Sequence, residues 1–391
     1  MPKVSIIIPT YNRADLLPAT LQSVFNQSFR DFEVIVVDDG SSDETRDVLE
    51  TFVDPRLTFI YQDKSGRSAA RNYGWKISQA PLTVFLDSDD LLLPDALGSL
   101  FKGLLDCPDV GAIGGGFLYI DERGCLLGEA QAWLNDQLDL SRWLVSCPFS
   151  IGGVIVRSEW LKKVGGFDTC FDFAEDWDLW LRMVASGCLM KWIKRPLFKY
   201  RLHSTRSSVN AEKHTRSSIQ ILDKYFAQDP IPPEALCLRR ESYGWAHVYG
   251  AAREFGAGQI EAAKLDLLQA SQYMPEWIDT GVLLETLLHN SQNPLVTFNP
   301  EGFRATVLEN LPQEVQRAGI YRRALGRLAA RNLFDSYRHQ NWSQVRHFWI
   351  KTILYDPSWL NNRGVLSIGI RGITHNKIFS RISGLFNNSN R

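Results

Sequence analysis

The chain has 391 residues, of which 45% are hydrophobic and 22% are charged, and its formal net charge is −1. This composition is typical of a globular protein with enough apolar side chains for a core, and the length favours two domains. The lack of net positive charge argues against a nucleic-acid partner. No run of about 18 apolar residues is present, and residues 1–13 lack the apolar segment of a signal peptide, so we expect a cytoplasmic protein.

Six cysteines are spread along the chain without a C-x-x-C pair. Their spacing fits neither a zinc site nor a dense disulfide framework. We therefore expect free and mostly buried thiols. The cysteines are Cys107, Cys125, Cys147, Cys170, Cys188 and Cys237.

Short apolar segments alternate with amphipathic segments through residues 1–90. Buried strands are expected over residues 4–8, 32–37, 57–61 and 83–86, and helices over residues 14–27, 43–52 and 67–79. Strands and helices that alternate in this way predict βαβ units around a parallel sheet. Ligands of such sheets bind beyond the carboxyl ends of the strands, and this chain has its polar clusters at those ends.

The pattern changes in the second half of the chain. Further strands are expected over residues 110–120, 152–157 and 191–200, with helices over residues 158–164 and 175–187. After residue 210 helical patterns dominate, so the predicted domains are residues 1–210 and an all-α domain over residues 211–391. Residues 249–275 and 331–357 are predicted as helical hairpins that end in Tyr-x-Pro. They resemble degenerate tetratricopeptide repeats, and unrelated helical packing is the alternative.

Asp87, Ser88, Asp89 and Asp90 directly follow an apolar strand. Carboxylates placed this close repel one another, and a hard divalent cation such as Mg²⁺ or Mn²⁺ relieves the repulsion by taking oxygen ligands. Such an ion also offsets the negative charge of a departing diphosphate. The alternative is a solvated acidic turn that caps the next helix, but the position at a strand end favours the metal.

Polar residues also follow the first two strands. After the first strand, the ring of Tyr11 can stack on a base and Arg13 can approach a phosphate. After the second strand, Asp39 can accept a hydrogen bond from a base or a ribose, or it can be a simple turn residue. The G-x-G-x-x-G loop of dinucleotide-binding folds is missing after the first strand, which argues against a dehydrogenase.

Three further candidates and a pair of tryptophans each have a functional and a structural interpretation. Arg71 lies in a helix that small residues open, so it can reach a diphosphate or remain an exposed helix residue. Asp176 can take the proton of an attacking hydroxyl, or it can simply complement a helix dipole together with its acidic neighbours. His203 ends a strand and can complete a metal shell, or be structural. Trp177 and Trp180 can form a platform for sugar rings or belong to the core.

Seven motifs of the first half, taken in order, resemble those of the family 2 glycosyltransferases, which have the GT-A fold. The resemblance covers about residues 3–208, and the ordered set is specific although each motif alone is weak. The motifs are VSIIIPTYNR, FEVIVVDDGSSD, SGRSAARNYG, FLDSDDLLLP, VGGFD, EDWDLWLR and YRLHSTRSS.

The resemblance implies an inverting transfer from a nucleoside-diphosphate sugar, with Mg²⁺ or Mn²⁺ as cofactor. In this family the residues matching Pro9, Tyr11 and Asp39 hold the nucleoside. Arg71 falls in the helix after the loop near the base and phosphates. Asp87 is the first acid of the family's D-x-D motif.

The same resemblance implies a metal site and a catalytic base. Asp89 matches the likeliest metal ligand, and Asp90 is the stand-in for it in related enzymes whose register is shifted. His203 matches a metal-binding histidine that only some members have. Asp176 matches the general base of the family's E-D motif.

The resemblance also bears on the product. Members that build and extrude long polymers carry a Q-x-x-R-W motif and membrane helices, and this chain has neither. We therefore expect a non-processive enzyme of cell-surface polysaccharide or glycoconjugate synthesis. Its acceptor would be a glycan, a lipid-linked molecule or a protein.

Two other functions stay open from the sequence. A nucleotidyltransferase also uses carboxylates, a metal and a nucleotide, but normally has a glycine-rich basic loop in place of residues 9–13. A catalytically inactive scaffold on the same fold would use the helical half as its working surface. That half is expected to serve acceptor docking, homodimerisation or partner binding. Residues 365–386 form either a segment that rests on a membrane surface or a packed terminal helix.

Overall fold

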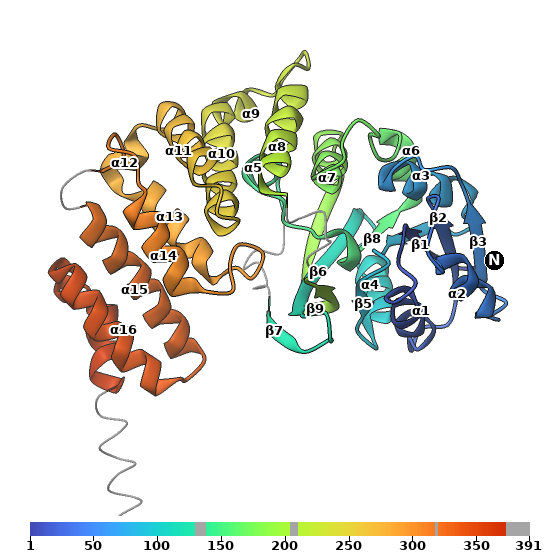
Figure 1. Ribbon diagram of the computed structural model, residues 1–391, viewed down its shortest axis with the longest axis horizontal. Coiled ribbons are helices and arrows are strands. Elements are labelled where there is room, and N and C mark those ends of the chain that lie inside the picture. The colour runs from blue at the N-terminus through green and yellow to red at the C-terminus, as the bar shows by residue number, and fades with distance from the viewer. Residues whose placement is uncertain (130–137, 204–209, 317–319, 373–391) are drawn as a thin grey trace, which may run out of the picture. The chain divides into compact units, whose positions relative to one another are not determined.

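The computed structural model describes residues 1–129, 138–203, 210–316 and 320–372 (Figure 1). Contacts between α-carbons divide the chain into two compact units, Met1–Ala246 and His247–Arg391. The first unit contains the sheet with its flanking helices, and the second is helical.

A mixed sheet of nine strands lies in the first unit; seven of them match predicted strands, and the short β5 and β7 were not predicted. Its order is β3-β2-β1-β4-β8-β6-β9-β5, and β7 pairs with β6. β1 runs parallel to β2 and β4, whereas β8 pairs antiparallel with β4 and β6. The strands are β1 (Val4–Thr10), β2 (Phe32–Asp38), β3 (Leu57–Tyr61), β4 (Leu82–Phe85), β5 (Leu91–Leu92), β6 (Val110–Ile120), β7 (Leu126–Glu129), β8 (Val154–Arg157) and β9 (Leu189–Arg201).

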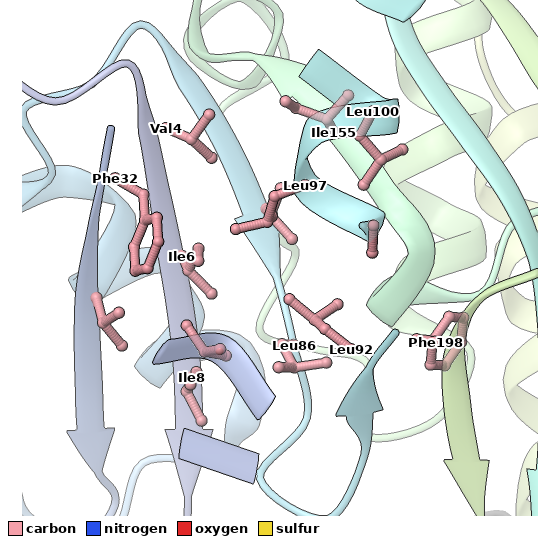
Figure 2. Packing of buried hydrophobic residues seen from close by; sticks show 14 of the residues in the cluster. Val4, Ile6, Ile8, Phe32, Leu86, Leu92, Leu97, Leu100, Ile155 and Phe198 are labelled. Carbon is pink, nitrogen blue, oxygen red and sulfur yellow. The ribbon is translucent and has the colours of Figure 1, made fainter. Parts of the chain in front are cut away.

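Helices cover this sheet and enclose its core. They are α1 (Leu17–Phe25), α2 (Thr45–Thr51), α3 (Arg67–Ile77), α4 (Ala96–Leu105), α5 (Leu140–Val145), α6 (Ser158–Val164), α7 (Glu175–Ala185), α8 (Ala211–Phe226) and α9 (Pro233–Cys237). Side chains alternate between the two faces of a strand, and on β1 both faces are apolar. Ile6 and Ile8 belong to a core cluster with Leu97 and other residues of α4 (Figure 2). Ile7 faces α3 instead.

The strand expected over residues 152–157 is shorter than predicted. Ile151–Gly153 form a turn of 3-10 helix, and β8 begins at Val154. A β-carbon on Gly152 or Gly153 would lie 2.9 or 2.8 Å from the ring of Phe198. The two glycines therefore let this turn pass directly against the ring, which an alternation of apolar residues does not reveal.

The second unit contains the two expected hairpins. The helices of the second half are α10 (Arg239–Gly256), which spans the division, α11 (Ile260–Tyr273), α12 (Glu276–Thr280), α13 (Val282–His289), α14 (Pro300–Glu309), α15 (Ile320–Arg338) and α16 (Trp342–Tyr355). The hairpins are α10–α11 and α15–α16. Their turns contain Gly258 and Gln340, both with positive φ, at 74° and 54°. Among the described residues, no helix is long and apolar enough to cross a membrane.

The predicted domain boundary at residue 210 precedes the division observed after Ala246. Polar contacts explain why α8 joins the first unit. The Nζ of Lys224 on α8 lies 2.7 Å from carboxylate oxygens of both Asp168 and Asp178. The hydroxyl of Tyr243 in turn donates to Asp223 of α8. How far the catalytic domain itself extends stays a prediction.

None of the six cysteines, all of which lie in the described residues, forms a disulfide, as expected, but the prediction that most are buried is wrong. Cys188 is buried and Cys107 is half-buried, whereas the other four are exposed. The exposed thiols lie outside the strands and long helices or at the end of a short helix, where local hydrophobic patterns say little about burial.

Gly74 provides a test of the packing between α3 and β1. A β-carbon at this position would lie 2.6 Å from Cγ2 of Ile7. We expect Gly74→Val to lower the free energy of unfolding by about 1–3 kcal/mol, because overpacking forces neighbouring side chains to shift. Urea denaturation measures this, with Lys76→Val at an exposed position of the same helix as control. Equal stability of the two variants would contradict the packing described.

Candidate active site

A cleft of about 740 Å³ opens at the carboxyl ends of β1, β2 and β4. Parallel strands bring their carboxyl ends to one edge of the sheet, and ligands bind there in α/β folds. Most of the lining residues come from the motifs that follow β1, β2 and β4 and open α3, whereas Lys64, Asp172 and Phe173 lie outside the predicted motifs. The lining residues are Pro9, Thr10, Tyr11, Asn12, Arg13, Asp39, Lys64, Gly66, Arg67, Arg71, Asp87, Ser88, Asp89, Asp172 and Phe173.

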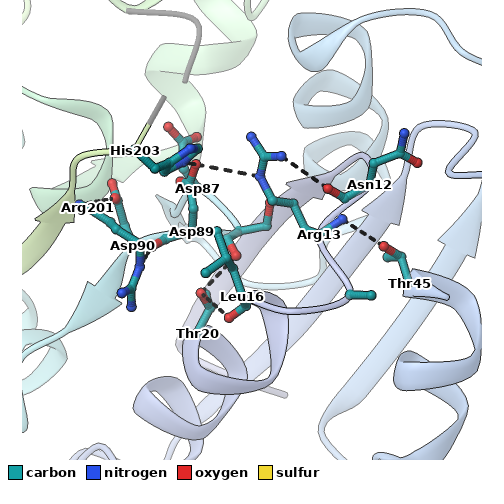
Figure 3. A network of polar contacts seen from close by, with 12 residues as sticks. Asn12, Arg13, Leu16, Thr20, Thr45, Asp87, Asp89, Asp90, Arg201 and His203 are labelled. Atoms are coloured by element: carbon teal, nitrogen blue, oxygen red, sulfur yellow. Dashed lines mark hydrogen bonds and ion pairs between the residues drawn. The ribbon is translucent and has the colours of Figure 1, made fainter. Parts of the chain in front are cut away.

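The acidic cluster after β4 gathers as predicted. Ligand oxygens of Asp87, Asp89 and Asp90 lie within 4.8 Å of one another. His203, which follows β9, brings its Nε2 to 2.9 Å from Oδ2 of Asp89 (Figure 3). The Nε of Arg13 lies 3.7 Å from the same carboxylate oxygen. The structure thus unites two of the predicted metal ligands that are 114 residues apart.

Asp90 differs from its neighbours. It is fully buried, and its Oδ1 accepts the backbone N–H of Arg201 at 2.9 Å. The guanidinium of Arg201 donates through Nε to the backbone carbonyl of Asp89, also at 2.9 Å. These contacts fasten the acidic turn to the end of β9 (Figure 3). Asp90 therefore has a structural task in addition to any role as a ligand.

The donor set suits a divalent cation. Three carboxylates within a few ångströms repel one another, and hard divalent ions take such oxygens together with an imidazole nitrogen. Asp89 and His203 are both largely buried and face each other. A cluster that concentrates acceptor oxygens and one imidazole in this way can hold a divalent metal ion.

Arg71 lies at the centre of a buried ionic bridge. Its side chain is 1% exposed; one nitrogen lies 2.5 Å from Oδ1 of Asp87 and another 2.7 Å from Oε1 of Glu175. Burial alone would lower the pKa of Arg71, but the charges of Asp87 and Glu175 raise it above its usual value. The guanidinium thus joins the acidic turn to the first turn of α7. Its predicted contact with donor phosphates stays a prediction, since these two carboxylates already engage it.

Asp39 also has a clear structural task. Its Oδ1 accepts hydrogen bonds from the side chain of Gln62 and the backbone N–H of Ser65, both at 2.7 Å. Its Oδ2 accepts the N–H of Gly66 at 2.8 Å. The carboxylate therefore shapes the loop that leads into α3. Because Asp39 also lines the cleft, its predicted role in nucleoside binding stays a prediction.

Pro9 and Tyr11 form the wall of the cleft at the end of β1. The Nζ of Lys64 lies 3.9 Å from the centroid of the half-exposed Tyr11 ring. A cation at this distance is attracted to the face of the ring. Sequence reasoning missed Lys64, because its loop precedes α3 and reaches Tyr11 only in the folded chain.

Asp176 occupies the first turn of α7 and is partly buried. Burial, together with the negative charge of Glu175, raises its pKa to about 7. The residue before this turn, Ala174, has a left-handed backbone with φ of 55°, a conformation that strains a non-glycine residue. Asp176 is not one of the residues that line the cleft, although the charges of Arg71 and Asp87 act on it.

The segment that leads to Asp176 is held from two sides. The side chain of Asn72 donates to the carbonyl of Phe167 and accepts its N–H, both at 2.8 Å. On the other side, Lys224 binds Asp168 near the start of this segment and Asp178 within α7. These contacts fix both ends of the segment. Sequence reasoning missed Lys224 because α8 lies beyond the recognised motifs.

The two tryptophans of α7 belong to the core. Trp180 is fully buried, and Trp177 is buried with its Nε1 donating to the carbonyl of Trp143. Neither ring is free to stack on a sugar. This settles the choice between platform and core in favour of the core.

The raised pKa of Asp176 predicts a pH-dependent stability. The folded protein keeps a proton that the unfolded chain releases, so stability present below pH 3.8 is lost as the pH rises towards about 7. Asp176→Asn removes this charge. Without ligands, we expect its melting temperature to exceed that of wild type by a margin that grows between about pH 4 and 7. Asp172→Asn, an exposed change in the same segment, is the control, and a margin independent of pH would contradict the prediction.

Known proteins resemble this chain in both sequence and fold. Residues 5–163 match the model of glycosyl transferase family 2. An uncharacterized glycosyltransferase of Haemophilus influenzae is 27% identical over 233 residues, which are 58% of this chain and 77% of that protein.

Two solved structures share the fold. TarS of S. aureus, in complex with UDP-GlcNAc, is 18% identical with a TM-score of 0.52, over 79% of this chain and 89% of that one. The mannosyltransferase PcManGT of Pyrobaculum calidifontis, in complex with GDP-Man and Mn²⁺, is 20% identical with a TM-score of 0.50, over 79% and 87%. Residues 5–163 are therefore a glycosyl transferase family 2 domain by similarity, and the protein is a glycosyltransferase.

Proposed function

We propose that the protein transfers a sugar from a nucleoside-diphosphate sugar to an acceptor hydroxyl, with inversion at the anomeric carbon. The observation that carries this proposal is the buried bridge of Arg71, which holds the acidic turn after β4 and the first turn of α7 on one guanidinium. A cation site for the departing diphosphate and a carboxylate base are the two parts that such a transfer needs.

The donor would occupy the cleft, with its nucleoside against Pro9, Tyr11 and Asp39. An aromatic ring offers a stacking surface for a base, and a carboxylate accepts hydrogen bonds from a base or ribose. Two proteins of the same fold support a nucleotide-sugar donor, because the structure of TarS is a complex with UDP-GlcNAc and that of PcManGT is a complex with GDP-Man.

Asp89 and His203 are proposed as the residues that hold a divalent ion, Mg²⁺ or Mn²⁺, with Asp87 and Asp90 beside them. When bound, the ion would supply positive charge next to the diphosphate oxygens. The 2.9 Å contact between Asp89 and His203 supports this choice, as does the Mn²⁺ of PcManGT.

Asp176 is proposed as the general base. The acceptor oxygen attacks the anomeric carbon on the face opposite the diphosphate, and its proton passes to a carboxylate oxygen of Asp176. The bond from the anomeric carbon to the diphosphate oxygen breaks, and its electron pair leaves with the nucleoside diphosphate. A carboxylate with a pKa near 7 combines a basic oxygen with the ionised form needed at neutral pH. Arg13, Lys64 and Arg67 line the same cleft and can stabilise the departing charge.

The acceptor is proposed to be a hydroxyl of a glycan, a lipid-linked molecule or a protein, in cell-surface polysaccharide or glycoconjugate synthesis. The helical unit is proposed to serve acceptor docking or homodimerisation. The family match covers residues 5–163 and does not include the helical unit. The proposed role of that unit therefore assumes that it adds acceptor binding or dimerisation to the catalytic domain.

Asp176→Asn tests the assigned base. We expect the variant to bind its donor but to lose transfer at least about 100-fold, because a general base typically contributes this much or more. A thermal-shift screen of nucleoside-diphosphate sugars with Mn²⁺ identifies the donor, and release of the nucleoside diphosphate measures transfer. Asp109→Asn, an exposed carboxylate outside the cleft, is the control. Transfer at the wild-type rate would reject the assignment, and release of pyrophosphate instead would indicate a nucleotidyltransferase.

Asp89→Asn tests the metal site separately from the chemistry. We expect Mn²⁺ to bind at least about tenfold more weakly, because the variant loses a charged oxygen ligand that faces His203. Electron paramagnetic resonance counts free Mn²⁺ directly and needs no substrate. Asp109→Asn, an exposed carboxylate elsewhere in the same unit, is the control. Unchanged Mn²⁺ affinity of Asp89→Asn would remove Asp89 from the site.

A further inference from the structure

The C-terminal hairpin carries a charge that sets it apart from the rest of the chain. Residues 320–391 contain twelve Lys and Arg but only two Asp and Glu, whereas the whole chain has a net charge of −1. The excess of positive charge is therefore concentrated in α15, α16 and the residues after them. A partner that binds here must be rich in negative charge.

The outward face of α16 also exposes aliphatic side chains. Ile350 is 52% and Leu354 70% exposed, and with the exposed Ser343 and His347 they occupy one face of the helix. His347, Ile350 and Leu354 lie 4, 7 and 11 residues after Ser343. At 3.6 residues per turn, these spacings place all four side chains on one face of the helix. The opposite face of α16 packs into the hairpin core through Val345.

Cations border this apolar face on both sides. By helical geometry, Arg346 lies four residues before Ile350 on one border, and Lys351 lies four residues after His347 on the other. Both residues are half-buried. An aliphatic face with flanking long cations is the pattern by which a helix rests in the interface of a bilayer, its cations reaching the headgroups.

We propose that the outward face of α16 docks the protein on a membrane surface that contains anionic lipids. Ile350 and Leu354 enter the boundary between headgroups and acyl chains, and Arg346 and Lys351 bind lipid phosphates. A nucleic acid would match the charge but not the two exposed aliphatic side chains. The proposal does not depend on the reaction in the cleft.

Vesicle sedimentation with the full chain tests the proposal. We expect binding to vesicles of phosphatidylcholine mixed with phosphatidylglycerol, little binding to phosphatidylcholine alone, and weakening by salt. Leu354→Glu should reduce binding at least about tenfold, because it removes buried apolar area and adds a repelled charge. The double variant R346Q/K351Q should reduce it at least about tenfold, at about fivefold per charge.

Leu265→Glu is the matched control. Leu265 is 64% exposed on α11 of the other hairpin, so the same kind of change there should leave vesicle binding unaltered. Because all these side chains are exposed or at a border, melting temperatures should stay near that of wild type. Equal losses for Leu265→Glu and Leu354→Glu would overturn the proposal.

Two further outcomes would also overturn it. If Leu354→Glu converted an oligomer into a monomer in light scattering without changing vesicle binding, the face would be an interface between copies of this chain. If R346Q/K351Q abolished binding to RNA while vesicles bound neither variant nor wild type, the partner would be a nucleic acid.

Discussion

The buried guanidinium of Arg71 connects segments that each supply one part of the site. Asp87 begins the turn after β4, Glu175 begins α7, and both bind the buried guanidinium of Arg71. Removing one partner of such a buried pair leaves an uncompensated charge and is strongly unfavourable. The distance between the acidic turn and the proposed base is therefore set by a contact that tolerates little change.

Other charged side chains around the cleft also hold backbone segments in place. Asp39 shapes the loop before α3, and Asp90 fastens the acidic turn to β9. Lys224 ties the segment before α7 to the helix itself. Charged side chains near the cleft thus hold its backbone in place, which is the preorganisation that positioned catalytic groups require. Residues that look like ligands in sequence can serve first as supports.

The surroundings of Asp176 are unfavourable for the stability of the folded chain. The Asp176 carboxylate lies beside Glu175 in a partly buried turn that follows a left-handed alanine. Both the raised pKa and the backbone conformation are unfavourable for folding, and such features persist where the surrounding structure imposes them. Here the contacts of Asn72 with Phe167, and of Lys224 with Asp168 and Asp178, hold the segment around Asp176 in this conformation. A carboxylate held in this way has a pKa near neutral pH.

The local sequence pattern alone determined the alternating strands and helices, the two helical hairpins, and the strand ends that carry Pro9, Asp39 and Asp87. These features are local because hydrophobic periodicity and turn residues depend on neighbours that are close in sequence. Tertiary structure alone decided which distant groups meet. His203 reaches Asp89 across 114 residues, and Arg71 is buried in a bridge rather than exposed. Ion pairs between segments remote in sequence depend on how the elements pack, and no local pattern encodes that packing.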